Sequence, residues 1–437
     1  MKFYGRAHEL ELLRKNEEQS MRHATFTVLM GRRRVGKTTL LRHAFAGMDK
    51  AYLFVSRDSE AILCQKFQKA LSEQLGITAY GAISRFSDLF ELVMKESLRR
   101  HFTLIIDEFQ ELQRCNPAIF SQMQDIWDRY HMSSKINLIV CGSIHPIMKR
   151  IFGDKSEPLF GRPTSRMTLR PFSTTVLKQI LSDANPKFSN EDLLCFYMIT
   201  GGVAKYAELL IDANSVSKDA MLDYVCSSDS FFISEGMSVL SNEFQGEFST
   251  YFSIMQLIAG GMTRRSEIDS AVQKDTGAFL KFLDERYEMV GKLRPILAKP
   301  GSKISAYEIR DEFLRFWFRF IYPFQSQIEN DQLSLVRENI DKHYTEFTGR
   351  TLERYFQKKL METRNFTEIG NWWDRKGKSE IDIVAINSLS LEGVIAEVKR
   401  NSERISITAL KEKAKALPPH EFGKYHFKFK GLSLADM

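Results

Sequence analysis

The chain has 437 residues, of which 43% are apolar and 27% are charged. This size predicts roughly three domains of ~100–200 residues each, and the composition excludes a small disulfide-stapled module, a disordered chain and a coiled coil. The formal net charge of +7 is a mild basic excess, which is compatible with nucleic acid as a partner but does not require it.

The amino-terminal segment Met1–Arg6 leads directly into charged, helix-like sequence. It lacks the apolar stretch of a secretory signal, so we expect a cytoplasmic protein. The cysteines lie far apart without the spacing of zinc ligands or of a disulfide framework, which favours reduced, buried thiols. They are Cys64, Cys115, Cys141, Cys195 and Cys226.

A phosphate-binding loop follows the first predicted strand. The run Thr25–Met30 is apolar with β-branched residues, and it leads into Gly31–Thr39, which has the full pattern G-x-x-x-x-G-K-[ST]. Helical periodicity from Leu40 to Ala46 completes the order strand, loop, helix. Glycines allow consecutive backbone amides to point at phosphate oxygens, and the following helix adds its positive end. The expected nucleotide-binding residues are Gly31, Arg32, Arg33, Arg34, Val35, Gly36, Lys37, Thr38 and Thr39.

Specific roles follow for four side chains of this site. Lys37 would reach the β- and γ-phosphates of ATP, and the Thr38 hydroxyl would bind Mg²⁺. A second apolar run, Thr103–Ile106, ends in Asp107 and Glu108, at the strand edge where open α/β sheets bind ligands. We expect Asp107 in the Mg²⁺ shell and Glu108 as the base that orients the attacking water. The structural alternative is that the two acids cap the next helix.

A third strand is predicted at Ile136–Gly142, directly before Ser143. The Ser143 hydroxyl is expected either to sense the γ-phosphate or to cap the next helix, and one hydroxyl can do both. Further strands are predicted at Ala51–Val55 and Arg166–Leu169, with helical stretches between them. This alternation predicts an α/β fold with a mainly parallel sheet, in a P-loop core of residues 1–172.

These residues resemble the archaeal-type P-loop ATPases, relatives of the AAA+ and STAND ATPases. The family's opening box matches Tyr4–Leu10, which the resemblance implies to lie near the nucleotide base. Its Gly-Arg box matches Gly161 and Arg162, which makes Arg162 the expected arginine finger. A lid motif matches Gly201–Tyr206, with Ala204 where proline is usual. The resemblance implies ATP and Mg²⁺ as cofactors and a homo-oligomer in which Arg162 reaches a neighbouring subunit.

The middle of the chain is predicted to be helical. Residues 173–240 have helical periodicity with polar breaks, as expected for an ATPase lid. Residues 241–325 contain three short helical runs and a hairpin-like segment, which predict a winged helix-turn-helix. Its cations Lys274, Lys281 and Arg286 favour DNA contact, and a module that packs against protein is an equal alternative.

The most apolar window of the chain, Phe313–Phe324, contains Arg315 and Arg319. It is too short to span a bilayer of ~30 Å. Its spacing predicts a buried helix that ends near Pro323. We therefore expect no membrane segment.

Residues 326–437 carry a second group of chemically active residues. In two adjacent predicted strands, Asp382 lies on one, and Glu397 and Lys399 share a face of the next. Two carboxylates that hold Mg²⁺ and a lysine that polarises or deprotonates water are what a metal-dependent phosphodiester hydrolase needs. The structural alternative is a charged solvent face on an ordinary hairpin.

This second group resembles the PD-(D/E)xK nuclease superfamily, whose helical acid would fall at Glu353. The resemblance implies a C-terminal α/β domain of the restriction-endonuclease type. Two functions therefore remain open. One is an ATP-driven enzyme that cuts or grips DNA, and the other is a nucleotide-switched interaction protein whose tail only binds.

Overall fold

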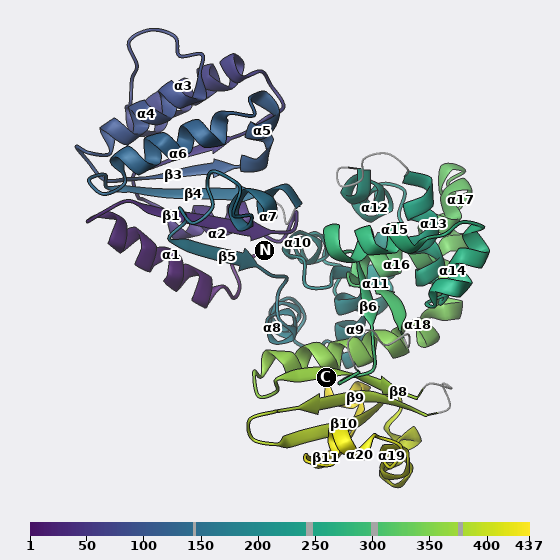
Figure 1. Cartoon of the computed structure of the whole chain (residues 1–437). Helices are drawn as coiled ribbons and strands as arrows, with labels where there is room; N and C mark the ends of the chain where they lie inside the picture. Colours follow the sequence, from purple (N-terminus) through teal and green to yellow (C-terminus); the bar gives the residue numbers. More distant parts are fainter. Residues whose placement is uncertain (143–145, 242–247, 299–304, 375–378) are drawn as a thin grey trace. The chain divides into compact units, whose positions relative to one another are not determined.

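The computed structural model divides into two compact units (Figure 1). We call Gly5–Arg170 unit N; it corresponds to the predicted P-loop core. Unit C consists of Met1–Tyr4 and Pro171–Met437, and it contains the predicted lid, three-helix region and tail. The structure describes residues 1–142, 146–241, 248–298, 305–374 and 379–437.

Among the residues that the structure describes, the sheet of unit N has five strands, all parallel. They are β1 Thr25–Gly31, β2 Lys50–Phe54, β3 Phe102–Asp107, β4 Ile136–Gly142 and β5 Ser165–Leu169. Their order across the sheet is β2, β3, β4, β1, β5. Strands β3 and β4 are buried along their whole length, as expected for apolar runs in a parallel sheet covered on both faces. The prediction of an α/β fold with a parallel sheet is confirmed.

Helices cover both faces of this sheet. Those of unit N are α1 Ala7–Ser20, α2 Lys37–Ala44, α3 Glu60–Leu75, α4 Phe86–Glu96, α5 Leu112–Cys115, α6 Ile119–Tyr130 and α7 Pro146–Gly153. Helices α3, α4 and α6 share one apolar cluster with the sheet, and α1 lies on the opposite side (Figure 1). Loops at the carboxyl ends of the strands are therefore free to form a ligand site.

Buried polar contacts hold α1 against the sheet. Asn16 Nδ2 donates to Thr27 Oγ1 at 3.0 Å, and Thr103 Oγ1 donates to the Glu17 carboxylate at 2.7 Å. Glu17 is only 5% exposed, so these bonds offset the cost of removing its charge from water. A helix that is charged in sequence can therefore pack on the sheet.

Unit C begins with the helices predicted for the lid. They are α8 Thr174–Ala184, α9 Asn190–Thr200, α10 Ala204–Asp212, α11 Lys218–Val225 and α12 Phe231–Ser241. In the lid motif, Gly201 ends α9 with φ 54° and Gly202 has φ 88°, a region that favours glycine. Ala204 is the first residue of α10, the helix position at which proline is well tolerated.

Three short helices and a two-stranded antiparallel sheet follow, in the order predicted. They are α13 Phe248–Ala259, α14 Arg265–Val272, α15 Gly277–Lys281, β6 Val290–Leu293 and β7 Ala306–Ile309. A single π-helical turn, Phe282–Arg286, continues α15. This is the element order from which a winged helix was predicted.

The apolar window forms the buried helix α16, Glu312–Phe320. It ends at Phe320, three residues before Pro323, which agrees with the predicted end near this proline. A 3₁₀ turn, Tyr322–Phe324, follows. Arg315 stays buried because it pairs with Glu312 at 3.2 Å and its guanidinium lies 3.8 Å from the centre of the Phe347 ring.

In its described ranges, the tail contains a four-stranded mixed sheet with helices. Its strands are β8 Glu368–Trp373, β9 Glu380–Ile386, β10 Glu392–Lys399 and β11 His426–Ser433, and its helices are α17 Gln325–Glu329, α18 Leu333–Glu362, α19 Ile407–Ala414 and α20 Pro419–Phe422. The sheet order is β11, β10, β9, β8. The β10–β11 pair is parallel, and the other pairs are antiparallel.

Within the described ranges, no helix is long and apolar enough to cross a membrane. The same part of the chain contains all five cysteines as free thiols.

Candidate functional site

The phosphate loop lies between β1 and α2. Gly36 precedes α2 with φ 99°, a backbone conformation that side chains rarely adopt. A Cβ on Gly31 would lie 2.9 Å from the Leu169 carbonyl oxygen, so glycine is required at both ends of the loop. Lys37 Nζ donates to the carbonyl oxygens of Gly31 at 2.7 Å and Arg32 at 3.1 Å. The loop therefore wraps around the Lys37 ammonium.

Lys37 is 8% exposed. Burial lowers its pKa, and the nearby carboxylates of Glu108 and Asp107 oppose that effect. A buried cation at the base of a loop of backbone amides suits the β- and γ-phosphates of a nucleotide. Lys37 and the phosphate loop therefore fit a nucleotide, which is the ligand that the sequence implies.

Thr38 and Asp107 come from different elements and meet beside this loop. Thr38 Oγ1 lies 3.4 Å from Asp107 Oδ2, and the Glu108 backbone amide donates to Asp107 Oδ1 at 2.9 Å. A hydroxyl next to a carboxylate that is 6% exposed supplies the hard oxygen ligands that Mg²⁺ prefers. Thr38 and Asp107 would hold the ion.

The sequence did not predict Tyr52 as part of this site. Tyr52 lies on β2, which pairs with β3, and its hydroxyl donates to Asp107 Oδ2. Burial and the Asp107 carboxylate raise the pKa of Tyr52 above its ordinary value. In sequence, Tyr52 is one residue of an apolar strand, and only the pairing of β2 with β3 reveals its role.

Glu108 has a left-handed backbone conformation, with φ 53°, and its side chain makes no helix-capping hydrogen bond. Gln110 Nε2 donates to Glu108 Oε2. Gln110 is 4% exposed, and its Oε1 has no hydrogen-bond partner in the part of the chain that the structure describes. A Cβ added to Gly142 would lie 2.3 Å from that oxygen. Gln110 therefore bonds to Glu108 and packs closely against Gly142 at the end of β4.

The remaining residues predicted for this site have different positions. Ser143 lies outside the described residues. Arg162 pairs with Asp128 on α6 of its own chain, through Nη2 at 2.9 Å and Nε at 3.4 Å. Its role as an arginine finger stays a prediction. Arg6, in the amino-terminal box, donates to the Val35 carbonyl of the phosphate loop at 3.1 Å, so the box does contact the loop.

In the tail, the three predicted side chains converge. Lys399 Nζ lies 3.2 Å from Asp382 Oδ2 and 3.7 Å from Glu397 Oε1. Both carboxylates are buried, at 8% and 7% exposure. Burial lowers the pKa of Lys399, but the charges of Asp382 and Glu397 outweigh this effect and the pKa is raised. A second lysine, Lys413 on α19, lies 3.0 Å from Glu397 Oε1 and was not predicted.

Glu353 on α18 adjoins this group and bonds to Arg350. Its burial, with a contribution from Asp382 and Glu380, raises the pKa of Glu353 to about 7. Among the described residues, no three or more His, Cys, Asp or Glu side chains are arranged to hold a metal ion. A Mg²⁺ ion there would depend on Asp382 and Glu397, which suffices where substrate phosphate and water complete the shell.

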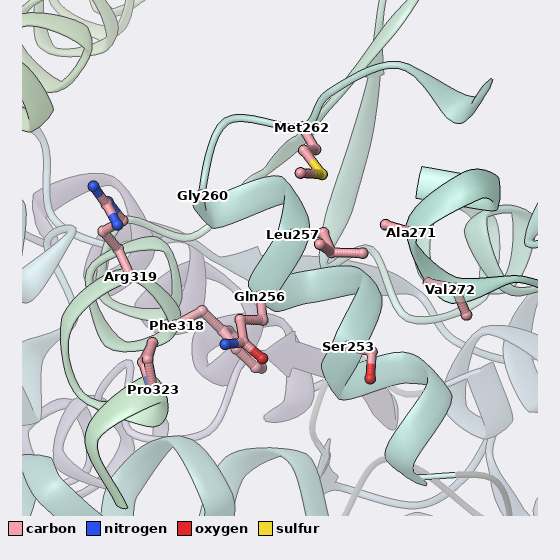
Figure 2. A pocket seen from close by; sticks show the side chains of 10 residues that line it. All are labelled: Ser253, Gln256, Leu257, Gly260, Met262, Ala271, Val272, Phe318, Arg319 and Pro323. Atoms are coloured by element: carbon pink, nitrogen blue, oxygen red, sulfur yellow. The ribbon is translucent and has the colours of Figure 1, made fainter. Parts of the chain in front are cut away.

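In the three-helix region, Lys274, Lys281 and Arg286 are exposed. Lys274 Nζ lies 4.7 Å from the centre of the Phe279 ring. A hollow of about 580 Å³ opens between α13, α14 and α16. Figure 2 shows Ser253, Gln256 and Leu257 along one helix of this hollow, which contains none of the predicted site residues.

Two family models match the chain. An ATPase domain found predominantly in Archaea matches residues 3–210, and a family of archaeal and bacterial proteins of unknown function matches residues 317–415. The first match includes the phosphate loop and the two acids at the end of β3. The second includes Asp382, Glu397 and Lys399.

The chain is also similar to individual proteins and solved structures. The uncharacterized protein MJECL04 of Methanocaldococcus jannaschii is 30% identical over 412 residues, which are 91% of this chain and 87% of the relative. Among solved structures, the Walker-type ATPase paby2304 of Pyrococcus abyssi is 17% identical with a TM-score of 0.53, and the match covers 72% of this chain and 96% of that one. The ORC2 protein of Aeropyrum pernix, in ADPNP and ADP complexes, is 14% identical with a TM-score of 0.49, over 76% and 95% of the two chains.

Proposed function

This chain belongs to the family of the Methanocaldococcus jannaschii protein MJECL04 and carries an archaeal ATPase domain, and on that premise we propose that it hydrolyses ATP with Mg²⁺. The observation that supports this most is the meeting of Thr38 and Asp107, 3.4 Å apart beside the phosphate loop. The loop and the two acids are separated by more than sixty residues in sequence. In the fold they lie together at the carboxyl ends of β1 and β3, two strands of the same parallel sheet.

The roles of the residues follow from their positions. The backbone amides of the loop and the Lys37 ammonium bind phosphate oxygens, and Thr38 and Asp107 hold Mg²⁺. When bound, Mg²⁺ neutralises charge on the phosphates. Glu108, held by Gln110, orients the attacking water and accepts its proton. Arg162 is the proposed arginine finger of a homo-oligomer, and it would have to leave Asp128 to act in a neighbouring subunit.

Glu108→Gln tests this assignment, because the substitution preserves shape and removes the negative charge. We expect ATP binding to be retained and the rate of phosphate release to fall at least ~10²-fold, in the range of a lost general base. Phosphate release at the rate of the unmodified protein would remove Glu108 from the site.

For the tail, we propose a second activity, hydrolysis of a nucleic-acid phosphodiester. The supporting observation is the convergence of Lys399 on Asp382 and Glu397. The two carboxylates would bind Mg²⁺, and Lys399 would polarise the water or stabilise the charge that develops on the phosphate. The exposed cations of the three-helix region would bring DNA to the tail.

The alternative is a nucleotide-switched interaction protein with a silent tail. Nicking of supercoiled plasmid by the full chain with Mg²⁺, with and without ATP, separates the two functions. Asp382→Asn should abolish nicking and leave ATP hydrolysis unchanged, because the two sites share no residues. If the chain shows no nicking under any of these conditions, the proposal of a phosphodiesterase fails, and the proposal of an ATPase does not depend on that result.

A further inference from the structure

Unit C contains a pocket of about 480 Å³ between the three-helix region and the tail. Its walls include Thr263 and Arg264 before α14, Tyr307 on β7, Arg350 on α18 and Trp373 on β8. No predicted site residue lines this pocket. Its volume is in the range of pockets that hold small molecules or nucleotides.

The walls of the pocket are fixed by ion pairs and hydrogen bonds. Arg354 donates to Glu308 at 3.1 Å and to the Ile309 carbonyl at 2.7 Å, which ties α18 to β7. It also pairs with Glu312. The pocket is therefore formed before any ligand binds, and a ligand does not have to bring its walls together.

The charges around the pocket are balanced. The arginines that line it are Arg264, Arg315, Arg350 and Arg354. Glu308 and Glu380 also line the pocket. Glu312 and Glu353 pair with arginines of its wall. A balanced pocket suits a neutral ligand with many hydrogen-bond donors and acceptors better than it suits a free phosphate. Partly exposed Trp373 adds an aromatic surface.

The pocket adjoins the carboxylate–lysine group of the tail. Glu380, in its wall, lies two residues before Asp382 on β9. Glu353 bonds to Arg350 of the wall and interacts electrostatically with Asp382 and Lys399. A ligand in the pocket that continues into the tail site would thus place a neutral aromatic group next to a phosphodiester.

We propose that this pocket binds an unpaired base of a nucleic-acid strand whose adjacent phosphodiester lies at Asp382, Glu397 and Lys399. The base stacks on the Trp373 indole, and guanidinium and carboxylate groups of the wall bond to its edge. The inference rests on the proposed tail activity for the position of the phosphodiester. It goes beyond that activity in naming a base subsite and a single-stranded substrate.

Tryptophan fluorescence of the full chain tests the proposal. The chain has four tryptophans, and three are buried: Trp127 at 3%, Trp317 at 0% and Trp372 at 6% exposure. Trp373 is therefore the one that a ligand can reach. Using Asp382→Asn protein to prevent cleavage, we expect saturable quenching by a single-stranded thymidine 12-mer. The quenching should disappear in Asp382→Asn/Trp373→Phe, and Asp382→Asn/Trp373→Ala, which removes the stacking surface, should bind a labelled 12-mer about tenfold more weakly.

An abasic 12-mer is the matched control ligand. It carries the same phosphates without bases, so we expect it to bind without quenching Trp373. Equal quenching by both oligomers, or no quenching by either, would overturn the base subsite. Quenching without nicking by the unmodified chain would keep the subsite and reject the hydrolase. Nicking without quenching would reject the base subsite and keep the hydrolase.

Discussion

The Tyr52 hydroxyl donates a hydrogen bond to Oδ2 of Asp107. The same oxygen lies 3.4 Å from Thr38 Oγ1, and the other carboxylate oxygen accepts from the Glu108 amide at 2.9 Å. The Asp107 carboxylate is thus positioned by a side chain of the edge strand β2, a side chain of α2 and the backbone amide of the next residue. The orientation of the proposed Mg²⁺ ligand depends on Tyr52, a residue outside every motif in the sequence.

Tyr52→Phe should therefore weaken Mg²⁺ binding. The substitution removes one hydrogen bond to a charged group, typically ~1.5–3 kcal/mol, and we expect the Mg²⁺ concentration that half-stabilises the ATP-bound protein to rise about tenfold. Nucleotide binding in the presence of a chelator should not change. The measurement is the melting temperature of the full chain as a function of Mg²⁺ at fixed ATP.

Tyr130→Phe is the matched control for this experiment. Tyr130 donates to Glu91 Oε1 at 2.9 Å, so the change removes a similar phenol–carboxylate bond between α6 and α4. Tyr130→Phe should leave the dependence of the melting temperature on Mg²⁺ unchanged. If Tyr52→Phe and Tyr130→Phe have the same effect, Tyr52 has no particular role toward the metal.

The motif residues could be predicted because each set is contiguous in sequence. The loop Gly31–Thr39 stands between a predicted strand, Thr25–Met30, and a predicted helix, Leu40–Ala46, and the acids 107–108 directly follow an apolar run. Tyr52, Gln110 and Lys413 could not be found this way. Each acts through a contact made by the fold, and each has an ordinary sequence context: a strand, a turn and a charged helix.

The role of Arg162 illustrates a different difficulty. Arg162 fits the family's arginine-finger position, but sequence could not show that Asp128, on another helix, pairs with it. The tail triad was easier, because alternation on two strands is enough to place three side chains together.

Gly142→Ala should slow ATP hydrolysis without weakening ATP binding. A Cβ at this position would lie 2.3 Å from Gln110 Oε1, the end of a flexible side chain, so we expect Gln110 to move and release Glu108. Phosphate release should fall about tenfold at saturating ATP. Gly153→Ala is the control, because nothing lies within 4 Å of its added Cβ. An unchanged rate in Gly142→Ala would show that Gln110 does not position Glu108.

Mixing of variants tests Arg162. If Arg162 acts on the nucleotide of a neighbouring subunit, Arg162→Ala protein should regain ATP hydrolysis when it is mixed with Lys37→Ala protein, which supplies an intact arginine. If Arg162 only pairs with Asp128, no mixture recovers activity. In that case Arg162→Ala and Asp128→Ala should lower the melting temperature to a similar extent.

Glu353 should make unit C less stable as pH rises. Its pKa is raised from 4.5 to about 7, so the folded state binds more protons than the unfolded state between these values. The free energy of unfolding should therefore fall across pH 4.5–7, by at most ~3.5 kcal/mol at ~1.4 kcal/mol per pKa unit. The free energy of unfolding of Glu353→Gln should depend less on pH between 4.5 and 7. Denaturant unfolding in a metal chelator measures the effect, and equal slopes in both proteins would contradict it.

Calorimetric titration of the full chain and of Lys37→Ala with ATP and Mg²⁺ tests the central assignment most directly. Lys37 is the buried cation around which the phosphate loop folds. We predict saturable binding by the unmodified chain and, at the same protein concentration, no measurable binding by Lys37→Ala that retains its fold by circular dichroism. Equal ATP affinity in the two proteins would contradict the account of this site.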